Sequence, residues 1–176
     1  EADGHDHHGI DPHAWLDPVN GAAWLAVIAE TLSARDPEHA ATYTANAESA
    51  AAGIAALDSE LQAALAPAKG KRFVTFHDAY GYFTDHFGLE PALAVSLGDA
   101  STPSAARLRA IRDEVGGAVC AFPEANHDPR LLAAVTEGTD LRSGAPLDPE
   151  AGTLPPGPGL YAALLRGLGA ALADCL

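Results

Sequence analysis

Histidines are the residues of this 176-residue chain most able to do chemistry, and its eight histidines are unevenly distributed. Four of them lie within nine positions near the N-terminus, interspersed with aspartates: His5, His7, His8 and His13. Imidazole and carboxylate groups bind first-row transition metals, and short His-rich tracts are typical of metal binding. The tract therefore predicts a metal-related role, with a solvated polar N-terminus as the alternative reading.

Other candidate ligands follow predicted strands. His77 comes directly after the buried-strand pattern RFVTF, and Glu124 follows the pattern AVCAF in the same way. In a parallel sheet, the residues beyond the carboxyl ends of the strands meet at one edge. Zinc prefers about four nitrogen, sulfur or oxygen donors in a tetrahedron. The sequence therefore predicts a metal site drawn from five residues: His13, His77, Glu124, His127 and Asp148.

Each candidate also has a purely structural reading. His13 would cap the helix after it, and His77 would be a hydrogen-bonded buried histidine. Glu124 and His127 would cap a helix that begins near residue 128. Asp148 lies in a Pro-rich loop, where aspartate is an ordinary turn residue.

The two cysteines, Cys120 and Cys175, are not arranged as CxxC, which argues against a zinc knuckle or a thioredoxin-like centre. A disulfide between them in an oxidising compartment would close a loop of about 55 residues and stabilise the fold by roughly 4 kcal/mol. Two separate buried thiols in a cytosolic protein are an alternative that the two cysteines alone leave nearly as open.

The composition indicates a single domain, or one and a half small ones, with a real core. Apolar residues make up 48 % of the chain and charged residues 19 %. Acidic residues number 24 against 10 basic ones, and the net charge of −14 argues against nucleic-acid binding and favours cations as partners.

No apolar run approaches the roughly 20 residues of a membrane span. No signal-peptide pattern opens the chain, so an export signal is expected to be removed or never present.

The apolar pattern predicts two helices followed by an α/β unit. A helix after Asp17-Pro18 places Trp24, Val27, Ile28 and Leu32 on one face. An unbroken helix of about 45 Å is predicted over 37–66, with Asp36 as its N-cap and an apolar seam from Tyr43 to Ala64. Strands are predicted at 72–76, 92–97, 118–122 and near 139–144, and helices at 79–87, from 102, at 128–138 and at 160–176. Such alternation predicts a parallel sheet of about four strands flanked by helices.

Three motifs in their order along the chain carry a resemblance. They are DPHAWLDPVN before the long helix, FVTFHDAYGYFTDHFGL after it, and LDPEAG before the final helix. In these motifs the chain resembles the metal-binding periplasmic receptors of ABC transporters, closest to their zinc (ZnuA) type, over essentially all its residues. The resemblance implies a non-catalytic receptor that lies outside the cytoplasm, in the periplasm or an equivalent compartment. It captures Zn²⁺ and delivers it to a membrane permease. It divides the chain into the end of an N-terminal lobe (1–36), a connecting helix (37–66) and a C-terminal α/β lobe (67–176).

The resemblance also implies roles for individual residues. His13 and His77 match metal-binding histidines, and Asp148 matches an aspartate that is a ligand in some relatives and stays uncoordinated in others. The tract His5, His7 and His8 matches the end of a His-rich loop that gathers zinc. Cys120 and Cys175 match a disulfide pair. Manganese-type relatives place a carboxylate at the position of His77, so an imidazole there favours zinc.

One departure from the family pattern shapes the remaining expectations. Most of the N-terminal lobe, which supplies a further metal histidine, is absent from this chain. The apolar face around Trp24 and Ile28 then has no partner, which predicts a homodimer. The alternative from another class is a zinc hydrolase with His13, His77 and Asp148 as ligands and Glu124 as general base, although the chain has no HExxH or GxSxG motif. A structural or adhesive lobe is a third possibility.

Overall fold

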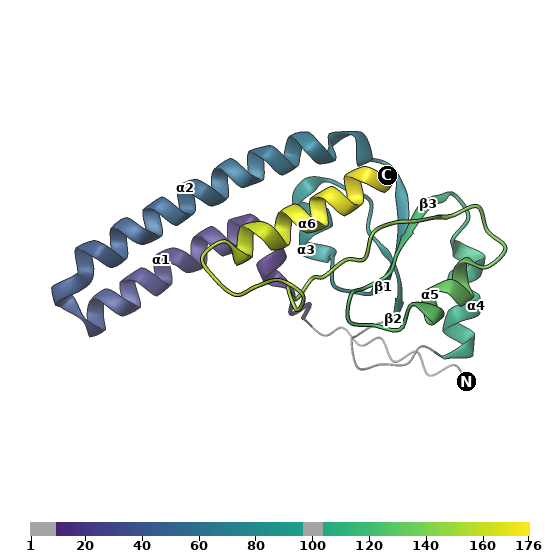
Figure 1. The fold of residues 1–176 in the computed structure, drawn as a ribbon, viewed down its shortest axis with the longest axis horizontal. Helices are drawn as coiled ribbons and strands as arrows, with labels where there is room; N and C mark the ends of the chain where they lie inside the picture. The colour runs from purple at the N-terminus through teal and green to yellow at the C-terminus, as the bar shows by residue number, and fades with distance from the viewer. Residues whose placement is uncertain (1–9, 97–103) are drawn as a thin grey trace.

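A computed structural model describes residues 10–96 and 104–176 and shows a helical hairpin joined to an α/β lobe. The hairpin consists of α1 (Pro18–Arg35) and α2 (Ala40–Leu65), and it projects away from the sheet (Figure 1). The tract His5, His7 and His8 lies outside the described residues, as does the predicted helix start at Thr102-Pro103.

Helix α1 begins where the sequence predicts it. The side chain of Asp17 accepts a hydrogen bond from the backbone N–H of Val19 at 2.8 Å, and Pro18 occupies the first helical position. The predicted apolar face is present but faces solvent, since Trp24 is 44 % exposed and Ile28 52 %. Among the described residues, this face therefore has no covering element.

The predicted long helix is divided into three parts. Two short 3-10 helices, η2 (Pro37–His39) and η3 (Ala66–Ala68), flank the 26-residue α2, which is about 39 Å long. Asp36 makes no side-chain cap, because its carboxylate instead bonds to His39 Nδ1 and Tyr43 Oη.

Only the C-terminal part of α2 enters the core. Its buried residues are Leu57, Leu61 and Leu65, so the seam ends at Leu65 rather than at Ala64. The N-terminal part of α2 packs mainly on α1, which explains why the hairpin projects from the lobe.

The predicted parallel sheet is confirmed. Its strands are β1 (Arg72–His77), β2 (Leu93–Ser96), β3 (Ala118–Phe122) and β4 (Arg142–Ser143), in the order β2-β1-β3-β4. Strand β1 is central, with Val74 paired to Leu93 of β2 and to Ala121 of β3. Five of its six residues are buried, as expected for the central strand of a sheet covered on both faces.

Helices cover both faces of the sheet. They are α3 (Gly81–Phe87), α4 (Ala105–Glu114), α5 (Pro129–Thr136) and α6 (Leu160–Cys175). Successive β1 side chains point to opposite faces, so Phe73 joins the core formed with α2, α3 and α6, and Val74 joins the core formed with α4 and α5. Among the described residues, no helix combines the length and apolar composition that crossing a membrane requires.

His86 of α3 ties the hairpin to the lobe. Its Nδ1 lies 3.2 Å from Asp17 Oδ1, and its Nε2 lies 2.7 Å from Asp58 Oδ1 on α2. Helix α3 then ends at Gly88, as predicted, with a φ of 64° that favours glycine. The start of α1, the body of α2 and the end of α3 are thus held together beside the segment that carries His13.

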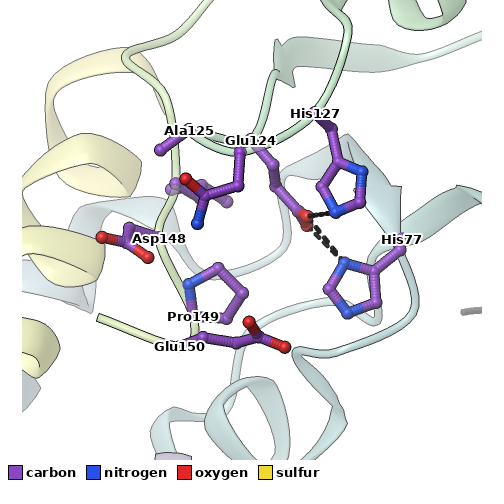
Figure 2. Close-up of a pocket in the computed structure, with 9 residues that line it drawn as sticks. His77, Glu124, Ala125, His127, Asp148, Pro149 and Glu150 are labelled. Atoms are coloured by element: carbon purple, nitrogen blue, oxygen red, sulfur yellow. Dashed lines mark hydrogen bonds and ion pairs between the residues drawn. The ribbon is translucent and has the colours of Figure 1, made fainter. Parts of the chain in front are cut away.

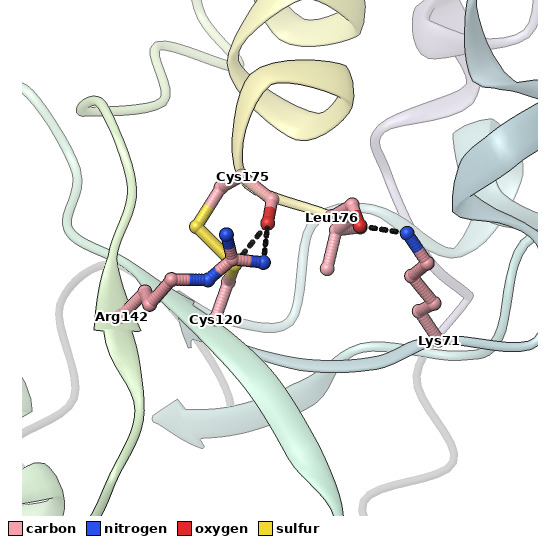
Figure 3. The surroundings of a disulfide bond; sticks show 5 residues. All are labelled: Lys71, Cys120, Arg142, Cys175 and Leu176. Carbon is pink, nitrogen blue, oxygen red and sulfur yellow. Dashed lines mark hydrogen bonds between the residues drawn. A yellow bond between two sulfur atoms is a disulfide. The ribbon is translucent and has the colours of Figure 1, made fainter.

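The disulfide that the resemblance implies is present. Cys120 of β3 is bonded to Cys175 at the end of α6 (Figure 3). The same chain end is held by two cations, because Arg142 donates to the carbonyl oxygen of Cys175 and Lys71 to that of Leu176. The final helix is therefore fixed to the sheet by one covalent bond and by charge-assisted hydrogen bonds.

Candidate metal centre

His13 and His77 meet at the carboxyl end of the sheet. His77 is the last residue of β1, and His13 precedes the 3-10 helix η1 (Ala14–Leu16). Both side chains are buried, and their Nε2 atoms lie 3.4 Å apart. We call these two Nε2 atoms the inner pair.

A carboxylate supports each imidazole from behind. His13 Nδ1 lies 2.7 Å from Asp11 Oδ1, and His77 Nδ1 lies 2.7 and 2.8 Å from the two oxygens of Glu124. When the carboxylates are ionised, each Nδ1 carries the proton and donates it, so each Nε2 presents a lone pair. Carboxylates in this position orient metal-binding histidines and make them more basic.

The spacing of the inner pair suits a tetrahedral zinc ion. With Zn–N bonds of 2.0–2.1 Å, two ligand nitrogens of a tetrahedron lie roughly 3.3–3.4 Å apart. The observed separation of 3.4 Å matches this value. Two lone pairs facing each other at that distance repel unless a cation or a proton lies between them.

Glu124 is positioned by the sheet and not by the helix after it. Its backbone bridges to Leu147, and Tyr80 Oη donates to its Oε1 at 2.8 Å. The helix-capping alternative fails, because the N-cap of α5 is Asp128, whose carboxylate accepts from the N–H of Arg130. Glu124 is thus 5 % exposed and committed to His77 and Tyr80.

His127 lies on the other side of Glu124. Its Nε2 is 3.5 Å from Glu124 Oε2, and its ring stacks on Phe76 with centroids 4.3 Å apart. Among the described residues, His77, Glu124 and His127 form the group of three metal-type side chains whose ligand atoms lie within 4.8 Å of one another. A cavity of about 20 Å³ opens beside them, and Asp148 and Glu150 also line it (Figure 2).

Asp148 lines this cavity, but its carboxylate points away from His77 (Figure 2). It accepts hydrogen bonds from the backbone N–H groups of Gly152 and Thr153 and from the Thr153 hydroxyl. Burial raises the pKa of the Asp148 carboxyl, but the hydrogen bonds from Thr153 and Gly152 outweigh burial and lower it. The structure thus brings His13 and His77 together and holds the Asp148 carboxylate in a turn.

Sequence reasoning did not identify Asp11 or Tyr80 as parts of the site. Both lie in the motifs that supply the histidines, Asp11 two residues before His13 and Tyr80 three residues after His77. An acid two residues from a candidate ligand and a buried tyrosine after it are the signals that would have indicated them.

A second set of contacts fixes the backbone around His13. Trp15 Nε1 donates to the carbonyl oxygen of Pro149 at 2.9 Å, and Tyr161 Oη donates to that of Trp15 at 2.9 Å. Burial, with a smaller contribution from Asp17, raises the pKa of Tyr161 to about 12, so the phenol remains a donor. The loop around Pro149 and helix α6 therefore position the His13 segment.

The fold and the site define an α/β lobe whose buried, carboxylate-supported histidines are arranged to hold a transition-metal ion. The family model described as "Zinc-uptake complex component A periplasmic" (ZnuA) matches residues 1–175. The chain belongs to this family.

Individual relatives agree with this assignment. The chain is 73 % identical over 170 residues to the "High-affinity zinc uptake system protein ZnuA" of Paracoccus denitrificans. The matched region covers 96 % of this chain and 52 % of the relative. It is 44 % identical over 168 residues to the protein of the same name from Brucella abortus, covering 94 % of this chain and 50 % of the relative. The chain spans about half the length of these curated relatives.

A solved structure shares the fold. The laminin-binding protein Lbp of Streptococcus pyogenes superposes with a TM-score of 0.81 at 32 % identity, covering 94 % of this chain and 64 % of that one.

Proposed function

We propose that this chain is the metal-binding part of a zinc receptor, which captures Zn²⁺ and presents it to an ABC-type permease. The observation that carries the proposal is the inner pair, two Nε2 atoms at 3.4 Å with a carboxylate behind each imidazole. The relatives' names support zinc as the ion, and an imidazole at both positions favours zinc over manganese.

Capture requires neutral imidazoles and an attractive surface field. Two histidines fill half of a tetrahedral coordination sphere, so water or a group from the part of the relatives that this chain does not span would complete it. The excess of acidic over basic residues attracts a divalent cation toward the site. Binding releases any proton held between the two Nε2 atoms, so affinity falls as the pH becomes acidic.

Calorimetric titration of the metal-free chain with zinc tests the proposal. We expect about one tightly bound zinc per chain, lost in both His13→Ala and His77→Ala. His39→Ala is the matched control, because His39 bonds to Asp36 at the far end of the hairpin. Tight binding that survives both ligand substitutions would contradict the proposal.

The hydrolase alternative is not favoured. A general base must reach the water that it deprotonates, but Glu124 is only 5 % exposed, and its carboxylate already accepts hydrogen bonds from His77 and Tyr80. Turnover of an ester or peptide panel that depends on zinc and on Glu124 would reopen this alternative.

A location outside the cytoplasm forms part of the proposal. The family description names periplasmic proteins, and the Cys120–Cys175 disulfide suits an oxidising compartment. Expression with and without an export signal, followed by thiol labelling, tests this: both cysteines are expected to be blocked only in the exported protein.

A further inference from the structure

We infer that His127 and Glu124 form a second cation position, the outer position, which a zinc ion occupies before it reaches the inner pair. This inference rests on the proposed function, because it concerns the route to the same site. The cavity of about 20 Å³ beside these residues is large enough for one water molecule or one ion. Figure 2 shows both side chains at its edge.

Distances place the ion on the His127 side of Glu124. His127 Nε2 and Glu124 Oε2 are 3.5 Å apart, close to the roughly 3.3–3.4 Å between two ligands of one zinc ion. His77 Nδ1 lies only 2.7 Å from the same oxygen, which is a direct hydrogen bond with no room for an ion. His77 therefore supports Glu124 here and keeps its Nε2 for the inner pair.

Glu124 has the capacity to bind an ion. A carboxylate offers about four lone-pair sites. Among the described residues, His77 Nδ1 donates to both oxygens and Tyr80 donates to Oε1. Oε2 carries fewer of these hydrogen bonds than Oε1, and it is the oxygen that lies 3.5 Å from His127 Nε2.

Exposure gives the order of binding. The side chain of His127 is 23 % exposed, whereas those of His77 and Glu124 are 2 % and 3 % exposed. The described residues that line the cavity include the acidic residues Asp148, Glu150 and Glu124, and none of them is lysine or arginine. A hydrated cation arriving from solvent is thus attracted to the cavity and meets His127 before His77.

The ligand types define the ion. One imidazole and one carboxylate suit zinc and its neighbours in the first transition row, whereas calcium and magnesium prefer oxygen ligands alone. The stacking of His127 on Phe76 fixes the ring that carries the ligand atom. If His127 had only a structural role, replacing it would change neither the number of bound zinc ions nor the rate at which they bind.

The test uses the full chain with His5, His7 and His8 replaced by alanine, so that the N-terminal tract binds no zinc. We expect calorimetry to show one tight and one weaker zinc. His127→Gln should remove the weaker zinc, leave the tight dissociation constant within about threefold, and slow zinc association by about fivefold or more in stopped-flow mixing. His39→Gln, the matched control, should change none of these.

The outcomes separate this inference from the proposed function. Unchanged stoichiometry and association rate in His127→Gln would overturn the outer position, while loss of the tight zinc in His13→Ala would still support the inner pair. Tight binding that disappears in His127→Gln and survives His13→Ala would overturn both. If His127→Gln folds poorly, the ¹⁵N resonances of the unsubstituted histidine decide: His127 Nε2 must shift with the second zinc equivalent, and an unshifted resonance overturns the inference.

Discussion

Asp11 and Glu124 set the chemistry of the two histidines from behind, without facing an ion held between the two Nε2 atoms of the inner pair. Each accepts from an Nδ1 and leaves the Nε2 lone pair pointing at its counterpart. Such supporting carboxylates typically change metal affinity by about 10–100-fold when they are replaced. Asp11 is the better test of the two, because it is partly exposed and its replacement leaves the core intact.

Asp11→Asn should weaken zinc binding by about tenfold. The amide oxygen still accepts from His13 Nδ1, but the negative charge that makes the imidazole more basic is lost. Competition with a zinc chelator measures the dissociation constant. Asp36→Asn is the control, since Asp36 holds His39 in a similar way but lies far from the site, and equal effects of the two substitutions would contradict the prediction.

Asp148→Asn separates two roles of one residue. The lowered pKa means that the ionised carboxylate stabilises the fold above its usual pKa of 3.8, and that this contribution is lost as the pH falls through the lowered value. The amide presents N–H groups to the donors of Gly152 and Thr153, so we expect about 1 kcal/mol less stability at pH 7. The difference should shrink below about pH 4 in denaturant titrations.

The same variant tests whether Asp148 is a ligand, as the matching aspartate is in some relatives. With the carboxylate held in the turn, we expect the zinc dissociation constant to change by less than about threefold. A tenfold weakening with unchanged stability would instead support Asp148 as a ligand.

At the scale of the elements, α6 packs against α2 at a glycine. A Cβ added to Gly169 would lie 2.5 Å from Leu61 Cδ2, whereas one added to Gly167 would meet no atom within 4 Å. Gly169 therefore permits a close contact between the two helices, and Gly167 lies on the exposed face of the same helix.

Alanine at these two positions should have opposite effects. Gly167→Ala should stabilise the chain by about 0.5–1 kcal/mol through helix propensity. Gly169→Ala should destabilise it by about 1 kcal/mol, because overpacking outweighs the same gain. Thermal unfolding of the two variants side by side measures the difference, and equal shifts in Tm would show that Leu61 moves aside at no cost.

Periodicity was sufficient to predict most elements but not their ends. Strand 118–122 was predicted residue for residue, and the long helix was placed correctly. Its division by 3-10 turns was missed, because Asp36 uses its carboxylate for His39 and Tyr43 and not for the helix. Side-chain competition of this kind leaves no trace in an apolar pattern.

The site was predicted less completely than the fold. His13 and His77 were identified from their motifs and do meet in space. The separate roles of Glu124, His127 and Asp148 depend on which way each side chain turns after its strand or loop, and spacing along the chain carries no such information.

At the scale of the whole molecule, α1 carries an apolar face that is exposed to solvent. Trp24 and Ile28 line a groove of about 590 Å³ between α1, α2 and α6, and Val27 beside them is 61 % exposed. Apolar patches of this kind usually mark an interface. The predicted homodimer would cover the groove with a second copy of the chain.

Light scattering should therefore show a dimer at micromolar concentrations, and Ile28→Lys should shift the chain to a monomer. Asn46→Lys adds the same charge on an exposed position of α2 and should leave the dimer intact. A clean monomer of the unsubstituted chain would contradict the prediction.

The packing of Trp15 gives the molecule a built-in optical signal. Its indole lies edge-on to the His13 ring with centroids 5.3 Å apart, and its N–H is fixed to Pro149. Zinc bound to His13 changes the surroundings of this indole, so the tryptophan emission should change when zinc binds. With Trp24→Phe, the fluorescence of the single remaining tryptophan would report occupancy of the inner pair directly, without any added dye.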